Sequence, residues 1–290
     1  QLDPEFVEDL LHGPQLTEHD LQSQQHRVKE LQTKLANMEQ TPAVRDLMSV
    51  ADHLLRRSVW IIGGDGWAYD IGSGGVDHVL ASGRDVNVLV LDTEVYSNTG
   101  GQASKSTPLG AVAKFASAGK PTAKKDMALQ AIAYGSVYVA RVALGADPQQ
   151  TLRAFREAEA YPGPSLIIAY SHCIAHGYDL RNGLDQQYKA VHCGHWPLMR
   201  YNPVLADEGR NPFLLDSPKP DETWREYTKL ELRYRMLQKA HPEEAERLLD
   251  LGQRQVERRY AEYAEMASRT AENFAVDARM SEFAASSNRA

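Results

Sequence analysis

The sequence predicts an α/β fold: a mainly parallel sheet with helices on both faces, and helical extensions at the N- and C-terminal ends. Apolar runs at residues 59–62, 86–91, 137–142 and 165–170 have the length and composition of buried strands. Segments with helical character alternate with these runs, which is typical of a parallel sheet covered by helices. A chain of 290 residues, 42% of them hydrophobic, is long enough to bury one large core.

Residues 1–57 are expected to form a helical extension. Apolar residues that recur on one helical face predict an amphipathic helix over 17–38. Thr41-Pro42 interrupts this pattern, and a second helix is predicted over 44–57. The apolar face of the first helix consists of Leu21, Val28, Leu31, Leu35 and Met38.

Residues 58–220 are expected to form the α/β domain that contains the strands. Its final part, 204–220, is rich in proline and is predicted to be a loop. The helices predicted between the strands cover residues 74–81, 109–118, 126–134 and 148–160.

Residues 221–290 are predicted to form two or three amphipathic helices with a break near His241-Pro242. Both charge signs are interleaved along this segment. It is therefore interpreted as a solvated helical tail that wraps the core, rather than as a surface for nucleic acid or a membrane.

Composition excludes several classes of protein. The formal net charge of −7 argues against a nucleic-acid-binding protein, and no run of apolar residues is long enough to span a membrane. The N-terminus lacks the basic region of a signal peptide, and two cysteines cannot form a disulfide scaffold, so a cytoplasmic protein is expected. Because the sequence does not begin with methionine, it is expected to be a piece of a longer protein.

Two polar turns point to a diphosphate site. Gly63-Gly64-Asp65-Gly66 follows the first predicted strand, and a polar run over residues 92–98 follows the second. Ligands of parallel α/β sheets collect beyond the carboxyl ends of the strands, where these turns meet. Mg²⁺ prefers oxygen ligands and often bridges carboxylates to phosphates, while glycines allow the backbone to approach a phosphate closely. The pattern predicts a diphosphate cofactor held through Mg²⁺, with Asp65 as the carboxylate ligand.

Other nucleotide and metal sites fit the sequence less well. A dinucleotide fingerprint that starts at Gly64 would need a glycine at position 69, which is Tyr69, and no P-loop motif is present. Four histidines that could suggest zinc lack a pair of thiolates at zinc-finger spacing. These histidines are His172, His176, His192 and His195.

The residues around both turns resemble a known family. The segments GGDGWAYDIGSGGVDHVLASGRDVNVLVLDTEVYSNTGGQ, STPLGAVAKFASAGK, AEAYPGPSLIIAYSHCIAHG and CGHWPLMRYNP are similar to the C-terminal thiamine diphosphate-binding domain of the pyruvate:ferredoxin (flavodoxin) oxidoreductases. The resemblance covers roughly residues 58–218. Most thiamine enzymes carry Asn-Asn near the second turn, whereas Asp92-Thr93 is the form that these oxidoreductases use.

The resemblance implies specific roles for site residues. Asp65, the Thr93 hydroxyl and the Val95 carbonyl would bind Mg²⁺, and Asn98 would lie near the reacting carbon as the catalytic amide. From the bare sequence alone, Asn98 would be interpreted as a turn residue. The remaining residues expected to contact the cofactor are Gly64, Gly66, Trp67, Glu94, Tyr96 and Ser97.

Cys173 carries a second implied role. A lone cysteine after a buried strand is usually a small core residue. In the family, however, the cysteine of YSHCIAHG is the fourth ligand of a [4Fe–4S] cluster near the thiamine. A cluster needs four thiolates, so the others would have to come from a segment that this sequence does not contain. Cys193 is interpreted as a packing residue.

The implied activity is oxidative decarboxylation of a 2-oxo acid, most specifically pyruvate, to acetyl-CoA and CO₂. Electrons would pass through iron–sulfur clusters to ferredoxin or flavodoxin, and the remaining domains of the parent enzyme would complete the site. A homodimer is expected for the parent enzyme, and the present chain is expected to be inactive alone.

Two alternatives remain open. The first is a non-oxidative thiamine diphosphate enzyme, such as a 2-oxo acid decarboxylase or an acetolactate synthase; Asp92-Thr93 and YSHCIAHG argue against it. The second is a non-catalytic assembly module whose terminal helices pack on a partner, which the apolar face of the 17–38 helix would allow.

Overall fold

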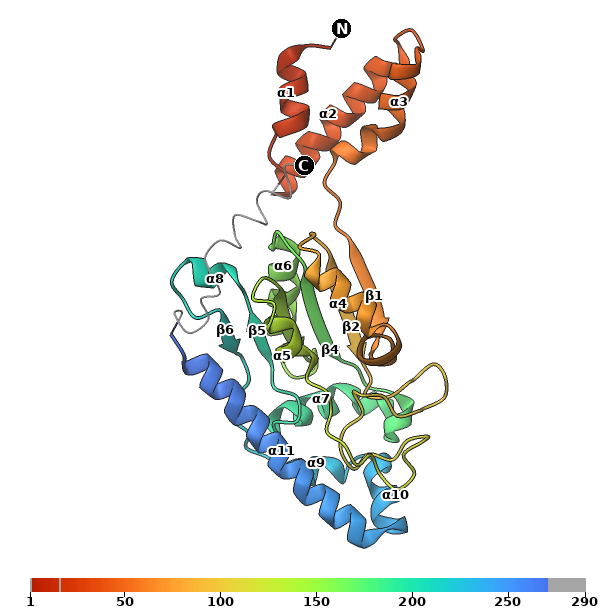
Figure 1. The fold of residues 1–290 in the computed structure, drawn as a ribbon, viewed down its shortest axis with the longest axis vertical. Coiled ribbons are helices and arrows are strands. Elements are labelled where there is room, and N and C mark those ends of the chain that lie inside the picture. Colours follow the sequence, from red (N-terminus) through yellow and green to blue (C-terminus); the bar gives the residue numbers. More distant parts are fainter. Residues whose placement is uncertain (1, 16, 271–290) are drawn as a thin grey trace. The chain divides into compact units, whose positions relative to one another are not determined.

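The computed structural model describes residues 2–15 and 17–270. The chain divides into two compact units, Gln1–Ser58 and Val59–Ala290 (Figure 1). The boundary lies next to the division expected at 57/58. The further division expected at 220/221 stays a prediction, and residues 271–290 of the expected tail lie outside the described residues.

The first unit is helical. Helices α1 (Pro4–His12), α2 (Glu18–Ala36) and α3 (Pro42–Val50) are followed by a short 3₁₀ turn, Ala51–Leu54. The Thr17 hydroxyl accepts from the Asp20 backbone N–H, and the Asp20 carboxylate accepts from the Thr17 N–H, so a capping box starts α2. The predicted apolar face is largely confirmed, because Val28, Leu31 and Leu35 are buried together. Helix α1 was not predicted.

The second unit is built on a six-stranded sheet in the order β1-β2-β4-β3-β5-β6. The pairs β1–β2, β2–β4 and β3–β4 are parallel, and β5 and β6 join in antiparallel pairs. The predicted mainly parallel sheet is therefore confirmed. The strands are β1 (Trp60–Gly64), β2 (Asn87–Asp92), β3 (Tyr138–Val142), β4 (Ser165–Tyr170), β5 (Met199–Tyr201) and β6 (Phe213–Leu215).

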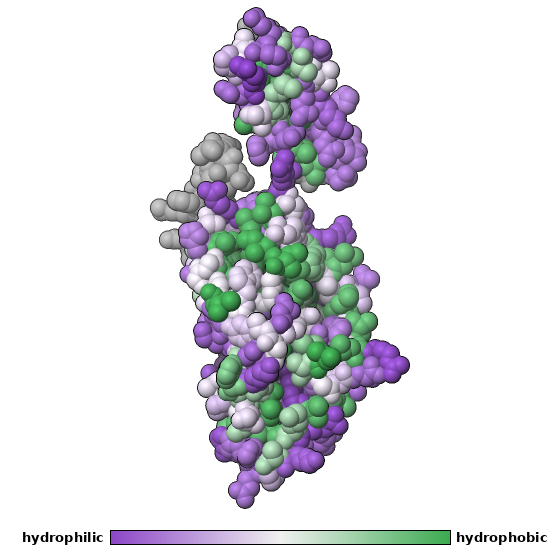
Figure 2. All heavy atoms as spheres, turned by 90° about the vertical axis from the view of Figure 1, so that its right-hand side faces the viewer, coloured by the Kyte–Doolittle hydropathy of each residue, from purple (hydrophilic) through white to green (hydrophobic). Residues whose placement is uncertain are grey.

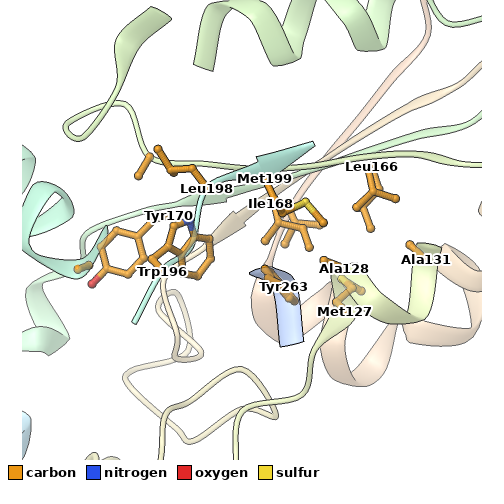
Figure 3. Packing of buried hydrophobic residues seen from close by; sticks show 14 of the residues in the cluster. Met127, Ala128, Ala131, Leu166, Ile168, Tyr170, Trp196, Leu198, Met199 and Tyr263 are labelled. Carbon is orange, nitrogen blue, oxygen red and sulfur yellow. The ribbon is translucent and has the colours of Figure 1, made fainter. Parts of the chain in front are cut away.

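Helices cover both faces of this sheet. Helices α4 (Ser73–Ala81) and α5 (Met127–Ile132) share the main core with inward residues of the strands, and Figure 3 shows α5 packed toward Leu166 and Ile168 of β4. Helix α6 (Pro148–Ala160) packs on the opposite face, against Tyr138, Ala140 and Ile167. Successive side chains of a strand point to opposite faces of the sheet, so alternate residues of one strand pack into two different cores.

Helix α6 covers only part of its face of the sheet. Near the carboxyl ends of β1 and β2, apolar side chains on this face are exposed. Ile62 and Leu91 are 62% and 41% exposed there, although Trp60 and Leu89, two residues earlier on the same strands, pack in the α6 cluster. Figure 2 shows hydrophobic residues exposed on one side of this unit.

One predicted helix is wrong. Residues 109–118 form irregular loop structure within a long connection between β2 and α5. Gly110, Phe115 and Gly119 have φ values of 77°, 66° and 77°, in the left-handed region that a right-handed helix cannot contain. The Lys114 amide instead donates to the Gly101 carbonyl, 2.9 Å away, so the loop folds back on its own first part.

The C-terminal segment is built into the core. After α7 (Gly183–His192) and α8 (Val204–Asp207) come α9 (Trp224–Thr228), α10 (Leu232–Ala240) and α11 (Pro242–Ser268), and the break predicted at His241-Pro242 is confirmed. Trp224, Tyr227 and Tyr263 are at most 1% exposed, so this segment is more than a solvated wrap. No helix within residues 2–15 and 17–270 has the length and apolar character to cross a membrane.

Candidate functional site

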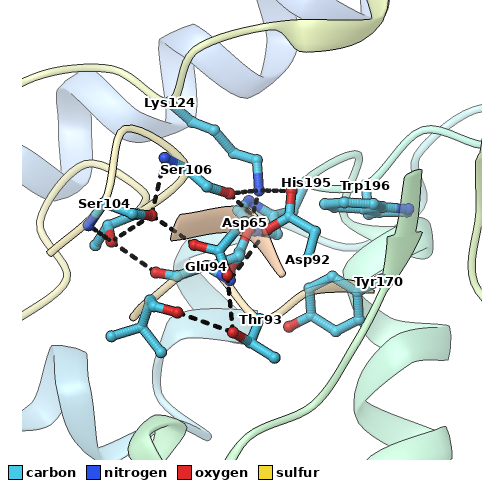
Figure 4. A network of polar contacts seen from close by, with 12 residues as sticks. Asp65, Asp92, Thr93, Glu94, Ser104, Ser106, Lys124, Tyr170, His195 and Trp196 are labelled. Atoms are coloured by element: carbon cyan, nitrogen blue, oxygen red, sulfur yellow. Dashed lines mark hydrogen bonds and ion pairs between the residues drawn. The ribbon is translucent and has the colours of Figure 1, made fainter. Parts of the chain in front are cut away.

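The predicted metal ligands meet at the carboxyl edge of the sheet. Strands β1 and β2 are parallel neighbours, with Gly64 paired to Leu91, so the turns that follow them lie side by side. The Thr93 hydroxyl is 2.9 Å from Asp65 Oδ1 and 2.9 Å from the Val95 carbonyl oxygen (Figure 4). A carboxylate, a hydroxyl and a carbonyl oxygen therefore converge on one point.

Asp65 lies in an environment that disfavours its negative charge. The residue is 1% exposed, and its second oxygen accepts a 2.6 Å hydrogen bond from Ser104. Burial, and next the charge of Asp92, raise the pKa of the Asp65 carboxyl to about 7. A divalent cation at this point would stabilise the ionised carboxylate, since opposite charge offsets both effects.

The donor set fits a hard cation. Oxygen ligands of three chemical kinds are typical of Mg²⁺, which takes few protein ligands and completes its shell with water or phosphate oxygens. In the part of the chain that the structure describes, no three His, Cys, Asp or Glu side chains gather as a metal cluster. A cation here would accordingly depend on one carboxylate and two neutral oxygens.

The glycines around Asp65 allow aromatic rings to approach the backbone. A β-carbon on Gly66 would lie 2.4 Å from the Tyr96 ring, and one on Gly63 would lie 2.3 Å from the Trp67 ring. A β-carbon on Gly64, by contrast, would make only an ordinary contact, 3.9 Å from the Leu91 carbonyl oxygen. Trp67 and Tyr96, both expected to contact the cofactor, thus also fix the shape of the first turn.

The remaining predicted residues of the second turn point in different directions. Asn98 is exposed at the end of the turn. The Ser97 hydroxyl lies 3.2 Å from the Cys173 thiol, so the loop after β4 reaches the loop after β2. His176 strengthens this contact, because its Nε2 lies 2.7 Å from the Thr93 carbonyl oxygen. The structure therefore brings Asp65, Thr93 and Cys173 to one edge of the sheet.

The Glu94 side chain is fully buried. One carboxylate oxygen lies 3.0 Å from Lys124 Nζ and 2.9 Å from His195 Nε2. Lys124 also donates to Asp92 Oδ2 at 2.9 Å, and Tyr69 donates to the same oxygen at 2.8 Å. Figure 4 shows Asp92, Glu94, Lys124 and His195 gathered close to one another.

Sequence reasoning missed most of this polar network. Its members come from segments far apart in the chain, and no short motif links them. His195 was considered only as a zinc ligand, whereas burial lowers the pKa of its imidazole despite the nearby Glu94 carboxylate. The residues that were missed are Ser104, Ser106, Lys124, Glu231 and Arg233.

A cavity borders the second turn at Glu94 and Val95. Its volume is about 460 Å³, and Val95, Gly100, Gly101 and Ala175 contribute to its walls. Arg233, from helix α10, contributes to the wall as well. The protein therefore has room for a small organic molecule beside the second turn, where Val95 is the one proposed metal ligand in the cavity wall.

Comparisons with known proteins agree with this geometry. Residues 35–169 match the family described as thiamine pyrophosphate enzyme, C-terminal TPP binding domain. Over 93% of its length, the chain is 54% identical to a putative pyruvate-flavodoxin oxidoreductase of Synechocystis sp.. The chain is a homologue of the thiamine pyrophosphate-binding part of pyruvate-flavodoxin oxidoreductases. It spans about a fifth of the length of the relatives it matches, 22% for this one.

Further relatives carry related names. A pyruvate-flavodoxin oxidoreductase of Trichormus variabilis is 56% identical over 91% of this chain and 22% of its own length. A pyruvate:ferredoxin oxidoreductase of Moorella thermoacetica is 55% identical over 77% of this chain and 19% of its own length. Among solved structures, 2-oxoglutarate:ferredoxin oxidoreductase from Magnetococcus marinus aligns with 39% of this chain and 40% of its own length, at 25% identity and a TM-score of 0.37.

Proposed function

We propose that this chain binds thiamine diphosphate through Mg²⁺, as part of an enzyme that oxidatively decarboxylates pyruvate to acetyl-CoA and CO₂. Electrons would pass through iron–sulfur clusters to ferredoxin or flavodoxin. The convergence of Asp65, Thr93 and Val95 at the sheet edge is the observation that carries the proposal. The names of the relatives supply the substrate and the electron acceptors.

In this proposal the chain's own residues hold and orient the cofactor. Asp65 binds the cation through the oxygen that contacts Thr93, while Ser104 fixes the other oxygen. The Thr93 hydroxyl would turn its proton away from Asp65 and offer a lone pair to the cation. When bound, the thiazolium ring supplies the carbanion that attacks the keto carbon and the electron sink that follows loss of CO₂. Asn98 is exposed at the end of the same turn and would present its amide to the reacting carbon.

Cys173 would give one thiolate to a [4Fe–4S] cluster beside the cofactor. Its position after β4 and its contact with Ser97 support this role. The sequence holds two cysteines, and the other, Cys193, is 1% exposed in the core. A cluster needs four thiolates, so the other three ligands must come from outside this chain.

A calorimetric titration of the 290-residue chain with thiamine diphosphate tests cofactor binding. We expect saturable heat in Mg²⁺, none in EDTA, and none for Asp65→Asn in Mg²⁺. Asp70→Asn is the matched control, because Asp70 lies five residues away and contacts the Lys105 backbone rather than the converging oxygens. A folded wild-type chain that gives no heat, or equal heat in EDTA, would contradict the proposal.

A turnover assay tests the dependence on the rest of the enzyme. The chain alone should not reduce a dye in the presence of pyruvate and coenzyme A, because it has at most one thiolate for a cluster near the cofactor. Reduction that requires both pyruvate and coenzyme A would show that this chain is sufficient, and would refute that dependence.

A further inference from the structure

Glu94 has an unusual backbone conformation at a critical place. It lies between two proposed metal ligands, Thr93 and Val95, and its φ is 59°. Among the described residues other than glycine, only Phe115 shares a positive φ. The left-handed region is unfavourable for any residue with a β-carbon, so surrounding contacts have to hold Glu94 in it.

This conformation separates the functions of three successive residues. The Thr93 hydroxyl contacts both Asp65 and the Val95 carbonyl oxygen, whereas the Glu94 side chain is buried in the protein. The Glu94 carbonyl oxygen accepts a 2.6 Å hydrogen bond from the Thr107 hydroxyl, so the backbone is held on that side as well. Glu94 is thus in position to orient the metal-binding turn without contacting the cation.

Arg233 holds the buried Glu94 carboxylate from helix α10. Its Nη2 atom lies 2.7 Å from Glu94 Oε2, while Lys124 and His195 contact the other oxygen, Oε1. Arg233 and Glu94 are 4% and 0% exposed, so water does not screen their interaction.

Arg233 is itself held within the C-terminal segment. Its Nε donates to Glu231 Oε2 at 2.5 Å, and Glu231 Oε1 accepts from Tyr227 at 2.8 Å and from Gln186 at 3.0 Å. The Arg233 guanidinium is therefore already held in place by Glu231 where it contacts Glu94. Lys124 also neutralises Asp92. Among the contacts found in the described residues, the Arg233 guanidinium pairs with the carboxylates of Glu94 and Glu231 and not with Asp92, so its removal leaves the Lys124–Asp92 pair in place.

We propose that Arg233 is a positioning residue for the metal-binding turn: through Glu94 it holds the Thr93 hydroxyl and the Val95 carbonyl in the arrangement that binds the cation. The C-terminal segment thereby contributes to cofactor affinity without touching the cofactor's metal. This inference rests on the proposed function, since it assigns a role in the same site.

The first test is a double-mutant cycle on Mg²⁺-dependent thiamine diphosphate binding, measured by calorimetry with the 290-residue chain. Arg233→Gln and Glu94→Gln should each weaken binding about tenfold, and the double variant should bind no more weakly than Glu94→Gln alone. Arg235→Gln, an exposed position on the same helix, is the control and should bind like the wild type. Unchanged affinity in Arg233→Gln, or fully additive losses, would overturn the inference.

The second test needs no cofactor. In hydrogen–deuterium exchange of the free chain, the amides of residues 93–96 should exchange faster in Arg233→Gln than in the wild type, while the amides of β3 and β4 keep their protection. Equal exchange of residues 93–96 in both proteins would overturn the inference. If Arg233→Gln fails to fold, Arg233→Lys, which keeps a positive charge, replaces it. The affinity of Arg233→Lys for thiamine diphosphate should fall between those of the wild type and Glu94→Gln. Wild-type affinity in Arg233→Lys would overturn the inference.

The two proposals fail in different ways. A folded wild-type chain that binds no thiamine diphosphate overturns the proposed function and the metal role of Arg233 together. A wild-type chain that binds normally, beside an Arg233→Gln chain that binds equally well, overturns the role of Arg233 alone.

Discussion

At the scale of single residues, the candidate site is formed by oxygens whose positions depend on hydrogen bonds among themselves. The Thr93 hydroxyl contacts two other candidate ligands, and Ser104 fixes Asp65 from the opposite side. Such pre-organisation lowers the cost of assembling the ligands when a cation arrives. The affinity should therefore be sensitive to the hydroxyl of Thr93 and insensitive to its methyl group.

Replacement of Thr93 by valine or serine tests this point. Thr93→Val keeps the shape and removes the hydroxyl, so Mg²⁺-dependent thiamine diphosphate affinity should fall at least about tenfold, or about 1.4 kcal/mol. Thr93→Ser keeps the hydroxyl and should bind within about threefold of the wild type. Titration calorimetry measures both, and equal binding by the valine variant would remove Thr93 from the ligand set.

Cys193 should be inert toward alkylation in the folded chain. Its thiol is 1% exposed, burial raises its pKa, and the reactive thiolate is correspondingly scarce. Iodoacetamide followed by peptide mass spectrometry should find Cys193 unmodified in the folded chain and modified in denaturant. Rapid modification of Cys193 in the native chain would contradict this account of the core.

Residue patterns in the sequence predicted that Asp65 and Thr93 would meet at one edge of the sheet, and the family resemblance supplied the Thr93 hydroxyl and the Val95 carbonyl as ligands. Neither predicted the residues that support them. Asp65 and Thr93 each follow an apolar strand, and strand ends of a parallel sheet meet at one edge. The partners of Glu94 come from positions 124, 195 and 233, and nothing in the local sequence around those residues marks the contact. Long-range polar networks depend on the tertiary fold, which local patterns do not determine.

At the scale of secondary-structure elements, Asp126 links a helix, a strand and the C-terminal segment. Its carboxylate caps α5 by accepting from the Leu129 amide at 3.1 Å and accepts from the Tyr263 hydroxyl of α11 at 2.8 Å. Burial alone would raise the pKa of Asp126, but the charges of Arg141 and Arg259, together with the hydrogen bonds from Leu129 and Tyr263, outweigh burial, and the pKa is lowered. The ionised carboxylate therefore stabilises the fold.

Asp126→Asn should lower the free energy of unfolding by about 2 kcal/mol at neutral pH, because it removes charged hydrogen bonds. Because the folded-state pKa of Asp126 is depressed, its contribution is present above the unfolded value of about 4 and is lost as the pH falls through the folded value. Urea unfolding of both proteins should show the difference shrinking in acid. A difference that is independent of pH would contradict the charge-based account.

Helix α11 packs so closely that it needs a glycine in its middle. A β-carbon on Gly252 would lie 2.0 Å from the Trp224 ring, whereas one on Gly74, in α4, would meet nothing within 4 Å. Gly252→Ala should therefore destabilise the chain by about 1–3 kcal/mol despite the better helix propensity of alanine. Gly74→Ala, the control, should stabilise it by up to about 1 kcal/mol. Urea unfolding shows whether each substitution raises or lowers the free energy of unfolding. A stabilised Gly252→Ala would show that the contact with Trp224 relaxes freely.

Element predictions succeeded where a strong apolar pattern was available. The four parallel strands and α6 follow from such patterns, whereas β5 and β6 have three residues each and lie in or near a proline-rich stretch that reads as loop. The false helix at 109–118 has suitable composition, but Gly110 and Gly119 bracket it in left-handed conformations. Short strands and loops held by tertiary contacts are the elements that local patterns miss.

At the scale of the whole molecule, the site depends on the second compact unit and its C-terminal segment. The two units are compact in their own right. Residues 224–268 place three nearly fully buried aromatic side chains in the core of the second unit and supply Arg233 to the site. Cofactor binding should therefore tolerate loss of the first unit but not of the C-terminal segment.

Two truncations test this division. A chain of residues 59–290 should bind thiamine diphosphate within about threefold of the complete chain, since every contact of the candidate site lies within the second unit. A chain of residues 1–220 should lose binding, because it loses part of the core and Arg233. Calorimetry with circular dichroism checks both. Loss of binding in 59–290 with its fold intact would contradict the division.

The most direct test of the central claim is a crystal structure of the chain with thiamine diphosphate and Mn²⁺, which accepts the same oxygen ligands as Mg²⁺ and can be located by anomalous scattering. The account predicts one anomalous peak about 2.0–2.3 Å from the Asp65 carboxylate, the Thr93 hydroxyl and the Val95 carbonyl, with diphosphate oxygens completing the shell. A diphosphate bound elsewhere, or a metal that bypasses these three oxygens, would contradict it.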